Sequence, residues 1–382
     1  MRRHLVLALA LTLAAVPPLA AQTGPEAKAA EPFKLGTFEI AGHQKIGIVL
    51  RDTIIIDVEA ANRALERNPA YPPIRMPGDM RELIGQYEYG LKYRLYELVT
   101  DIVANKRLTA TPRPAYVHDV GQVRTLAPLM PRKILNAAVN FYTHVNEGGT
   151  PEEQKKAADE RRRTRGVPYL FLKPTEGAII GNGDAVVIPW GRDRIDWEVE
   201  LGIVIGRAAK YVPATKAPDY IFGYMVTVDI SDRGGRPPDS RPGSDWFVGK
   251  GHDTFAPMGP WIVPKEFYGD PMKRLRQTLS VGGQQMQEGT AGDMIHSVYE
   301  LIEYASSIIT LFPGDVINNG TSGGVGMGRA VRGEQRFLKP GEVITASIEG
   351  IGTLTLPVVA GPEPPPGTGA YLPPVSSYRK PQ

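Results

Sequence analysis

Three carboxylates stand at alternate positions where an apolar segment begins, in DWEVELGIVIG (196–206). Successive side chains of a strand point to opposite faces, so Asp196, Glu198 and Glu200 would share one face of an extended chain. The Cα atoms of Glu198 and Glu200 would lie about 6–7 Å apart, which allows both side chains to hold one cation. The alternative is a solvent-exposed face that is neutralised by the two arginines just before the segment.

A further carboxylate, Asp229, closes the apolar segment GYMVTVDIS (223–231). Burying a carboxylate is costly unless it is paired or bound to a cation. If the two segments are neighbouring strands, Glu198, Glu200 and Asp229 form an all-oxygen site, which suits Mg²⁺ or Mn²⁺ and also allows Ca²⁺. Asp196 either adds a fourth ligand by its periodicity or lies one pleat too far out.

Two other groups of residues could act on a substrate at such a site. In NFYTHVNE, His144 and Glu147 are three residues apart. On one helical turn the carboxylate could orient the imidazole, and His144 could serve as a general base toward water. In WFVGKGHDTFAPMGPW, Lys250 stands between glycines and could approach a ligand as a compact cation. The simpler interpretations are a chance H-x-x-E spacing and a solvated loop lysine, and His252 either joins the site or lies free at the surface.

Two segments near these residues have patterns of their own. The glycine-rich NGTSGGVGMG (319–328) lacks the G-K-[ST] of a P-loop and a clear helix after it, so we reject a phosphate site of that kind. Its backbone amides and Thr321 could still hold a carboxylate. The charged run 152–166 predicts a solvated helix, or a mobile lid because it follows His144. We expect ordinary structural or surface roles for His43, His118 and His296.

The elements that must position these residues are mainly short strands. Apolar and polar residues alternate in 33–58, which predicts three antiparallel strands, and helical periodicity follows over 59–69 and 79–106. Together they form a small α+β N-terminal domain, 33–125. The block 130–358 predicts many strands and few helices. Its clearest elements are the helix 293–311 and strands at 133–139, 185–189, 196–206, 223–230, 260–263, 275–281, 315–318 and 342–348.

The first 21 residues, MRRHLVLALALTLAAVPPLAA, have the basic, apolar and small-residue regions of a secretory signal peptide. The apolar part is shorter than the roughly 20 residues of a membrane span, so we expect cleavage near Ala21 rather than an N-terminal anchor. The mature chain would begin with a flexible linker, 22–32, and would be periplasmic or secreted. A Pro/Gly-rich tail, 361–382, is expected to be extended or disordered.

The composition excludes some classes of function. The formal net charge is +3, or +1 without the two arginines of the signal peptide, which argues against binding nucleic acid or an anionic membrane. The chain has no cysteine, so disulfides and thiolates contribute neither stability nor chemistry. With 42 Gly and 35 Pro, the composition favours a turn-rich, β-rich protein over a helical bundle.

Taken in order, these segments resemble the fumarylacetoacetate hydrolase family. The resemblance covers about residues 130–358 and includes YLFLKPTEGAI, DYIFGYMVTVDISDR and NNGTSGGVGMG as well as the motifs above. Residues 33–125 are loosely similar to the small N-terminal domain of many members. The resemblance implies an α+β, β-rich fold, in which a mixed β-sandwich or roll carries the catalytic site. It also implies that the three carboxylates hold a divalent cation that chelates an α-keto acid or 1,3-diketone.

The same resemblance assigns roles to single residues. His144 and Glu147 match the family's base and its partner on a lid-like segment, and Lys250 joins them as a catalytic candidate. The implied substrate contacts are Lys173, Arg233, Arg236 and Thr321. The chain departs from the family where S-x-R-D-x-Q is usual, because it reads S-D-R-G-G-R. Gly234 thus replaces an acidic residue, and Arg236 either favours a more anionic substrate or turns away within a rearranged loop, 234–245.

The sequence therefore predicts an exported, metal-dependent hydrolase that cleaves a C–C bond in an acylpyruvate or related β-diketo acid through a metal-bound enolate. A keto–enol isomerase, decarboxylase or hydratase of the same fold is the first alternative. A non-catalytic periplasmic binder of keto acids is the second. By resemblance we expect a homodimer with a small-molecule substrate, no nucleic-acid partner and no membrane span after signal cleavage.

Overall fold

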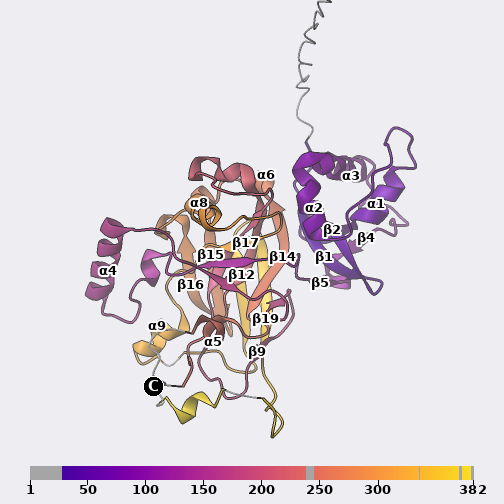
Figure 1. The fold of residues 1–382 in the computed structure, drawn as a ribbon. Coiled ribbons are helices and arrows are strands. Elements are labelled where there is room, and N and C mark those ends of the chain that lie inside the picture. Colours follow the sequence, from indigo (N-terminus) through magenta and orange to yellow (C-terminus); the bar gives the residue numbers. More distant parts are fainter. Residues whose placement is uncertain (1–27, 238–244, 335, 370–371, 380–382) are drawn as a thin grey trace, which may run out of the picture.

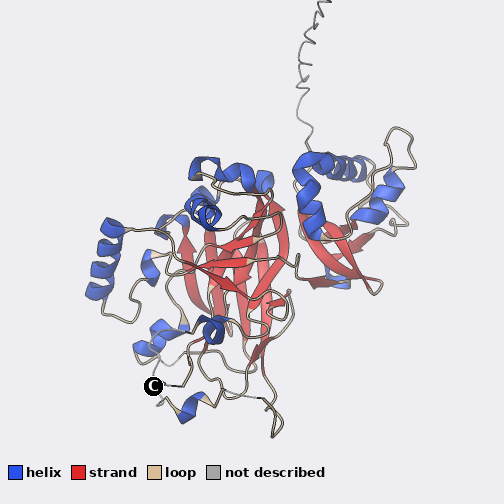
Figure 2. Cartoon of the chain, viewed as in Figure 1, coloured by secondary structure: helices blue, strands red, loops and turns tan. Residues whose placement is uncertain are grey.

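A computed structural model describes residues 28–237, 245–334, 336–369 and 372–379. The predicted signal peptide and most of the predicted linker lie outside the described residues, as do parts of the 234–245 loop and of the tail. Strands dominate the described chain, and helices lie at its periphery (Figure 1, Figure 2). No helix of the described residues is long and apolar enough to cross a membrane. The fold is α+β and rich in β-sheet, as predicted.

The strands are β1 (Lys34–Ile40), β2 (His43–Leu50), β3 (Ile54–Asp57), β4 (Val117–Asp119), β5 (Arg124–Leu126), β6 (Ile134–Ala137), β7 (Leu170–Lys173), β8 (Ile179–Ile180), β9 (Val186–Ile188), β10 (Ile195–Asp196), β11 (Val199–Ile205), β12 (Ile221–Val228), β13 (Ser231–Asp232), β14 (Ala256–Pro264), β15 (Arg276–Val281), β16 (Gln284–Thr290), β17 (Val316–Asn318), β18 (Val343–Ile348) and β19 (Gly352–Ala360). The α-helices are α1 (Val58–Leu65), α2 (Met80–Gln86), α3 (Lys92–Ala104), α4 (Pro151–Thr164), α5 (Trp246–Lys250), α6 (Lys265–Tyr268), α7 (Pro271–Arg274), α8 (Val298–Ile308) and α9 (Gly326–Val331).

The first three strands form the antiparallel meander that the alternating pattern predicts. The two residues Ala41-Gly42 connect β1 with β2, and the three residues 51–53 connect β2 with β3. Ala41, Gly42, Arg51 and Asp52 all have positive φ. Hairpin turns of this kind match the right-handed twist of the strands that they connect. Helices α1, α2 and α3 cover this meander in the lobe labelled at the right of Figure 1.

A large mixed sheet positions the site. Its strand order is β4-β3-β2-β1-β14-β12-β11-β17-β6-β7. β11 pairs antiparallel with β12 in a register that sets Val199 opposite Val228. The pairing continues one step beyond the strand ends, because the Asp229 amide donates to the Glu198 carbonyl at 2.8 Å. Glu198 and Asp229 are therefore neighbours across two strands, as the sequence pattern requires.

A second sheet packs against the first. Its strand order is β16-β15-β18-β19-β9, and Leu279 and Leu354 of this sheet share one hydrophobic core with Leu201 of β11. Two sheets joined by one core agree with the predicted sandwich-like catalytic region. Helices α6 and α8 lie at one end of the sheets, and α5 and α9 lie at the other (Figure 1).

Three predicted elements are interrupted or shorter in the structure. The helix predicted over 293–311 is α8, which begins only after Ser297, because Ser297 and Glu300 form a capping box there. His296 thus precedes the helix instead of lying on its first turn. The helix predicted over 79–106 is divided by a π-helical turn, Tyr87–Leu91, in which Gly90 has φ 118°. The strand predicted over 196–206 breaks between β10 and β11, where the Asp196 side chain accepts from the Trp197 amide.

Candidate functional site

Three carboxylates meet at the break between β10 and β11. Glu198 lies in the break, Glu200 on β11 and Asp229 just after β12, and all three are buried. One carboxylate oxygen from each lies within 4.8 Å of the other two. The sequence pattern brought these same three residues together, and their role as ligands stays a prediction. An all-oxygen set of this charge and spacing fits a hard divalent cation such as Mg²⁺ or Mn²⁺.

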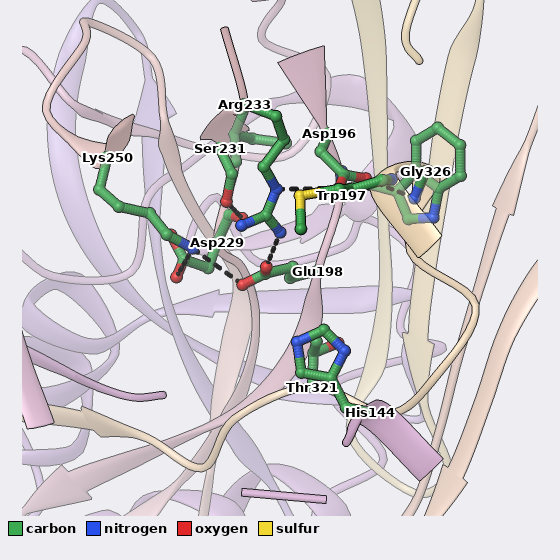
Figure 3. A network of polar contacts seen from close by, with 12 residues as sticks. His144, Asp196, Trp197, Glu198, Asp229, Ser231, Arg233, Lys250, Thr321 and Gly326 are labelled. Carbon is green, nitrogen blue, oxygen red and sulfur yellow. Dashed lines mark hydrogen bonds and ion pairs between the residues drawn. The ribbon is translucent and has the colours of Figure 1, made fainter. Parts of the chain in front are cut away.

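Cationic side chains surround two of the three carboxylates. Lys250 Nζ lies 2.9 Å from Glu198 Oε2 and 2.7 Å from Asp229 Oδ2. Lys173 contacts the other Asp229 oxygen and donates to the Ile230 carbonyl at 2.8 Å. Arg233 contacts Glu198, as Figure 3 shows. These contacts order the carboxylates and hold a positive charge close to where a substrate would bind.

Glu200 has a different environment from the other two carboxylates. Burial raises its pKa well above the usual value, and repulsion from Asp229 and Glu198 raises it further. Burial also acts on the pKa values of Glu198 and Asp229, but Lys250 and Arg233 outweigh it at Glu198, and Lys173 and Lys250 outweigh it at Asp229, so both pKa values lie below the usual range. Only the Gly320 amide, at 3.0 Å, donates to Glu200 within the described residues. Lys250, Lys173 and Arg233 thus pair with Glu198 and Asp229, and Glu200 has no ion-pair partner among the described residues. A divalent cation would balance the negative charge of Glu200.

Asp196 does not join the three carboxylates. Its oxygens accept from the Gly326 amide at 2.6 Å, the Met327 amide at 3.0 Å and Arg233 Nε at 3.0 Å. Of the two expectations for this residue, the geometry agrees with a position too far out and not with a fourth ligand. The physical reason is the chain break after β10, which turns the side chain toward the start of α9. Asp196 instead holds Arg233 between itself and Glu198 (Figure 3).

This arrangement predicts a structural effect without loss of metal binding. Replacing Asp196 with Ala should lower the free energy of unfolding by about 3 kcal/mol, because it removes one partner of a buried ion pair and the acceptor of three amides, those of Trp197, Gly326 and Met327. Denaturant titration measures the change. Asp193, three residues away and 63% exposed, provides the control, since its replacement with Ala should change stability by less than about 0.5 kcal/mol. An unchanged denaturation midpoint in the Asp196 variant would contradict the assignment.

His144 and Glu147 form a contact pair through Nδ1 of the imidazole. They do not share one regular helical turn: a 3₁₀ turn, Tyr142–His144, ends at the histidine, and Asn146 has φ 58°. The other Glu147 oxygen accepts from the Gly324 amide at 2.8 Å. The glycine-rich loop therefore fixes the carboxylate, and the carboxylate orients the imidazole. With Nδ1 donating to Glu147, Nε2 is the nitrogen left to accept a proton.

A small cavity of about 60 Å³ lies beside the carboxylates. Its lining includes His144, Glu198, Arg233, Lys250, Thr321, Phe171 and Trp246. Phe171 and Trp246 stack with ring centroids 4.5 Å apart and supply the aromatic part of the lining, and Lys250 Nζ lies 5.3 Å from the Phe171 ring centroid. The cavity is thus lined by the general-base candidate His144, the metal-ligand candidate Glu198 and two cationic side chains.

Two of the predicted site residues that line this cavity, Lys250 and Thr321, are held by further contacts. Lys250 is the last residue of α5 and is buried, so it is not a solvated loop lysine; Asp245 caps this helix by accepting from the Phe247 amide at 3.1 Å. Thr321 donates to the Val199 carbonyl at 2.9 Å and accepts from Gln287. Its hydroxyl proton is therefore already used within the protein.

Two predicted substrate contacts lie elsewhere. Lys173 sits behind Asp229 and is not among the residues that line the cavity. Arg236 is 40% exposed and pairs with Asp245 at 3.3 Å, so its side chain is directed toward the start of α5. Of the two expectations for Arg236, the geometry agrees with the one in which it turns away. The charged run forms α4, a helix whose only buried residue is Ala158.

The sequence did not indicate a second polar network next to the site. Arg192 Nε donates to Asp232 Oδ2 at 2.6 Å, and His252 Nε2 lies 3.2 Å from the same oxygen. Both Arg192 and Asp232 are buried. His252 is thus neither a free surface residue nor part of the cavity. Arg192 and Asp232 lie among other charged residues in the sequence, in GRDRID and DISDRGGR, so their charge did not identify their partners.

Comparisons with known proteins agree with this geometry. The family model "Fumarylacetoacetate (FAA) hydrolase C-terminal" matches residues 133–359. An uncharacterized protein from Pyrococcus abyssi is 43% identical over 232 residues, which are 60% of this chain and 91% of that protein.

Solved structures of similar fold cover more of the chain. Maleylpyruvate hydrolase from Sphingobium sp. SYK-6, in complex with manganese(II) ion and pyruvate, is 27% identical with a TM-score of 0.61, and the match covers 86% of this chain and 100% of that one. A 5-carboxymethyl-2-hydroxymuconate delta-isomerase from Mycobacterium smegmatis is 27% identical with a TM-score of 0.58 at the same coverage. The likeness therefore extends beyond the residues that the family model matches.

Proposed function

This chain belongs to the fumarylacetoacetate hydrolase family, and we propose that it is a divalent-metal-dependent hydrolase that cleaves a C–C bond in an acylpyruvate or related β-diketo acid. The observation that carries the proposal is the shared cavity, where His144 faces the carboxylate group of Glu198. A similar hydrolase with manganese(II) ion and pyruvate supports both a divalent metal and a keto-acid ligand.

The reaction adds water across one C–C bond. Water attacks the carbonyl farther from the carboxylate, the bond to the adjacent carbon breaks, and its electron pair goes to the carbon that becomes the methyl group of pyruvate. The products are pyruvate and a second carboxylic acid. A divalent cation at the three carboxylates would supply Lewis-acid stabilisation of the negative charge that develops on the keto-acid oxygens.

The residues of the chain supply the remaining functions. His144 takes a proton from the attacking water, and Glu147 holds the imidazole in the tautomer that accepts it. Lys250 and Arg233 place positive charge at the cavity, where they attract the substrate carboxylate. Lys173 acts indirectly, because it holds Asp229 in place.

Turnover of a small substrate panel tests the proposal. Acylpyruvates and oxaloacetate are incubated with the Mn²⁺- or Mg²⁺-loaded protein, with and without a chelator, and the products are identified. We expect chelator-sensitive loss of the enol absorbance, with pyruvate and a second acid in equal amounts. Carbon dioxide and pyruvate from oxaloacetate alone would instead indicate a decarboxylase. Tight metal binding without any turnover would contradict the proposal for this panel.

Isomerisation is the second candidate, because a delta-isomerase is among the similar structures. Such a reaction moves a proton and a double bond, needs the same base, and consumes no water. Product analysis separates the two candidates, since an isomerase gives one product of unchanged mass.

Export and dimerisation stay proposals. Export requires that the mature protein begin near residue 22, and mass spectrometry of protein from the periplasm would measure its first residue. Light scattering after size exclusion would give the mass in solution. A full-length protein found with the cytosol, or a mass of one chain, would contradict the respective proposal.

A further inference from the structure

The described part of the C-terminal tail contacts the loop that follows the Asp229 strand. Tyr378 Oη donates to the Gly235 carbonyl at 2.8 Å, and Arg379 Nε donates to the Gly234 carbonyl at 2.7 Å. Both tail residues lie beyond 359, where the family model ends. In Figure 1 this yellow segment lies at the same end of the sheets as α5 and α9. The tail thus supplies hydrogen bonds to successive carbonyls of one loop.

Glycines allow this close contact. A Cβ atom at Gly234 would lie 2.5 Å from Val375 Cγ2, and a Cβ atom at Gly191 would lie 2.9 Å from the Pro374 backbone. Val375 is buried, and its amide donates to the Gly191 carbonyl at 2.8 Å. The position at which the chain departs from the family pattern, Gly234, is therefore the position against which the tail packs.

A buried arginine connects the tail with the loop from the other side. Arg192 Nη1 lies 2.6 Å from Tyr378 Oη, and its Nη2 contacts the Gly235 carbonyl. Its Nε donates to Asp232, which also accepts from the Gly234 amide at 2.8 Å. The Arg233 amide donates to the Arg194 carbonyl at 2.9 Å. The segment 232–235 is thus held at its carboxylate, at two amides and at two carbonyls, and the tail contacts both carbonyls.

The residue inside this held segment is Arg233. Its guanidinium contacts Asp196 and Glu198 and lines the cavity. A long side chain keeps such a position only if its backbone is fixed, since ordering it costs about 2 kcal/mol of rotamer entropy.

We propose that residues 372–379 are a positioning element of the active site, which keeps Arg233 in the cavity by holding the Gly234-Gly235 backbone. Tyr378 and Arg379 are positioning residues, and neither lines the cavity. The proposal rests on the proposed function in one respect: it takes the ligand of the cavity to be an anion that binds next to a divalent cation at the three carboxylates. It predicts different effects on the two ligands: losing the Arg233 charge from the cavity weakens the binding of an anion and does not weaken the binding of a cation.

The double variant Tyr378→Phe, Arg379→Ala tests the proposal. Mn²⁺ is titrated first, and oxalate is then titrated into the Mn²⁺-loaded protein, because oxalate is a small dianion that chelates a metal as an α-keto acid does. We expect the Kd for oxalate to rise about tenfold, as loss of one charge-assisted contact implies, while the Kd for Mn²⁺ stays the same or falls. Arg379→Lys, which keeps a donor, should retain most of the oxalate affinity.

Matched measurements keep the test decisive. The control is Ser376→Ala, since Ser376 is exposed beside the same residues and should change neither Kd. Hydrogen exchange of a peptide spanning 231–236 needs no ligand, and it should become faster in the double variant only. Unchanged exchange, unchanged oxalate affinity, or an equal loss of Mn²⁺ and oxalate affinity would each overturn the positioning role. Wild-type protein that binds Mn²⁺ but not oxalate would contradict the proposed function, and exchange would still decide the role of the tail.

Discussion

Replacing Glu198 with Gln is expected to weaken Mn²⁺ binding by more than about 100-fold and to remove turnover. Residues that only support metal ligands already account for about 10–100-fold in affinity, so loss of a charged ligand should exceed that range. The amide keeps the shape of the side chain but has no charge and one acceptor oxygen in place of two, so Lys250 and Arg233 face the cation without the negative charge of their partner. Calorimetric or EPR titration with Mn²⁺ measures the affinity directly.

The matched control for this variant is Glu288→Gln. Glu288 lies on β16 and is 46% exposed, where it pairs with Arg276, so its replacement should leave both metal binding and turnover unchanged. Circular dichroism must show that the Glu198 variant is folded. A folded Glu198 variant with wild-type turnover would refute the metal site.

Replacing His144 with Ala should lower turnover by about 10²–10⁴, the usual contribution of a general base, and leave Mn²⁺ affinity unchanged. The imidazole contacts Glu147 and not the three carboxylates. Its removal should therefore abolish proton transfer and leave the three candidate metal ligands in place. His43→Ala provides the control, because His43 is exposed on β2. Steady-state rates and Mn²⁺ titrations on both variants give the comparison.

The same variant distinguishes an enzyme from a binding protein. A non-catalytic binder needs no base at the cavity, so its oxalate affinity and its lack of turnover would be the same with or without His144. Loss of Mn²⁺ affinity in the His144 variant would show instead that the imidazole is a ligand, and it would contradict the assignment made above.

Alternation along one strand and a carboxylate at the end of another predicted the group Glu198, Glu200 and Asp229. Both signals are local in the sequence. The pairing register of β11 with β12 is what brings the three carboxylates close together in space. Periodicity could not assign Asp196, because its role depends on the start of α9, 130 residues later. The break in the chain after β10 is likewise set by tertiary contacts.

The fold class was predictable because it too follows from local hydrophobic patterns. Individual strands were harder to predict. β16, with the sequence QQMQEGT, is mostly polar because much of it faces solvent, so hydrophobic periodicity does not reveal it. The contact of Arg192 with Tyr378 spans 186 residues. No local pattern encodes a pairing of that separation.

The sheet itself limits how the protein can be divided. β1 pairs with β14 through Leu35 and Ile262, and Phe33 shares a hydrophobic cluster with Phe222 and Ile262. A protein truncated to residues 130–382 would expose these apolar side chains and leave an unpaired edge on β14. Exposed edges of this kind promote aggregation. A recombinant protein of residues 130–382 should therefore be insoluble, even though it contains every residue of the candidate site and the tail.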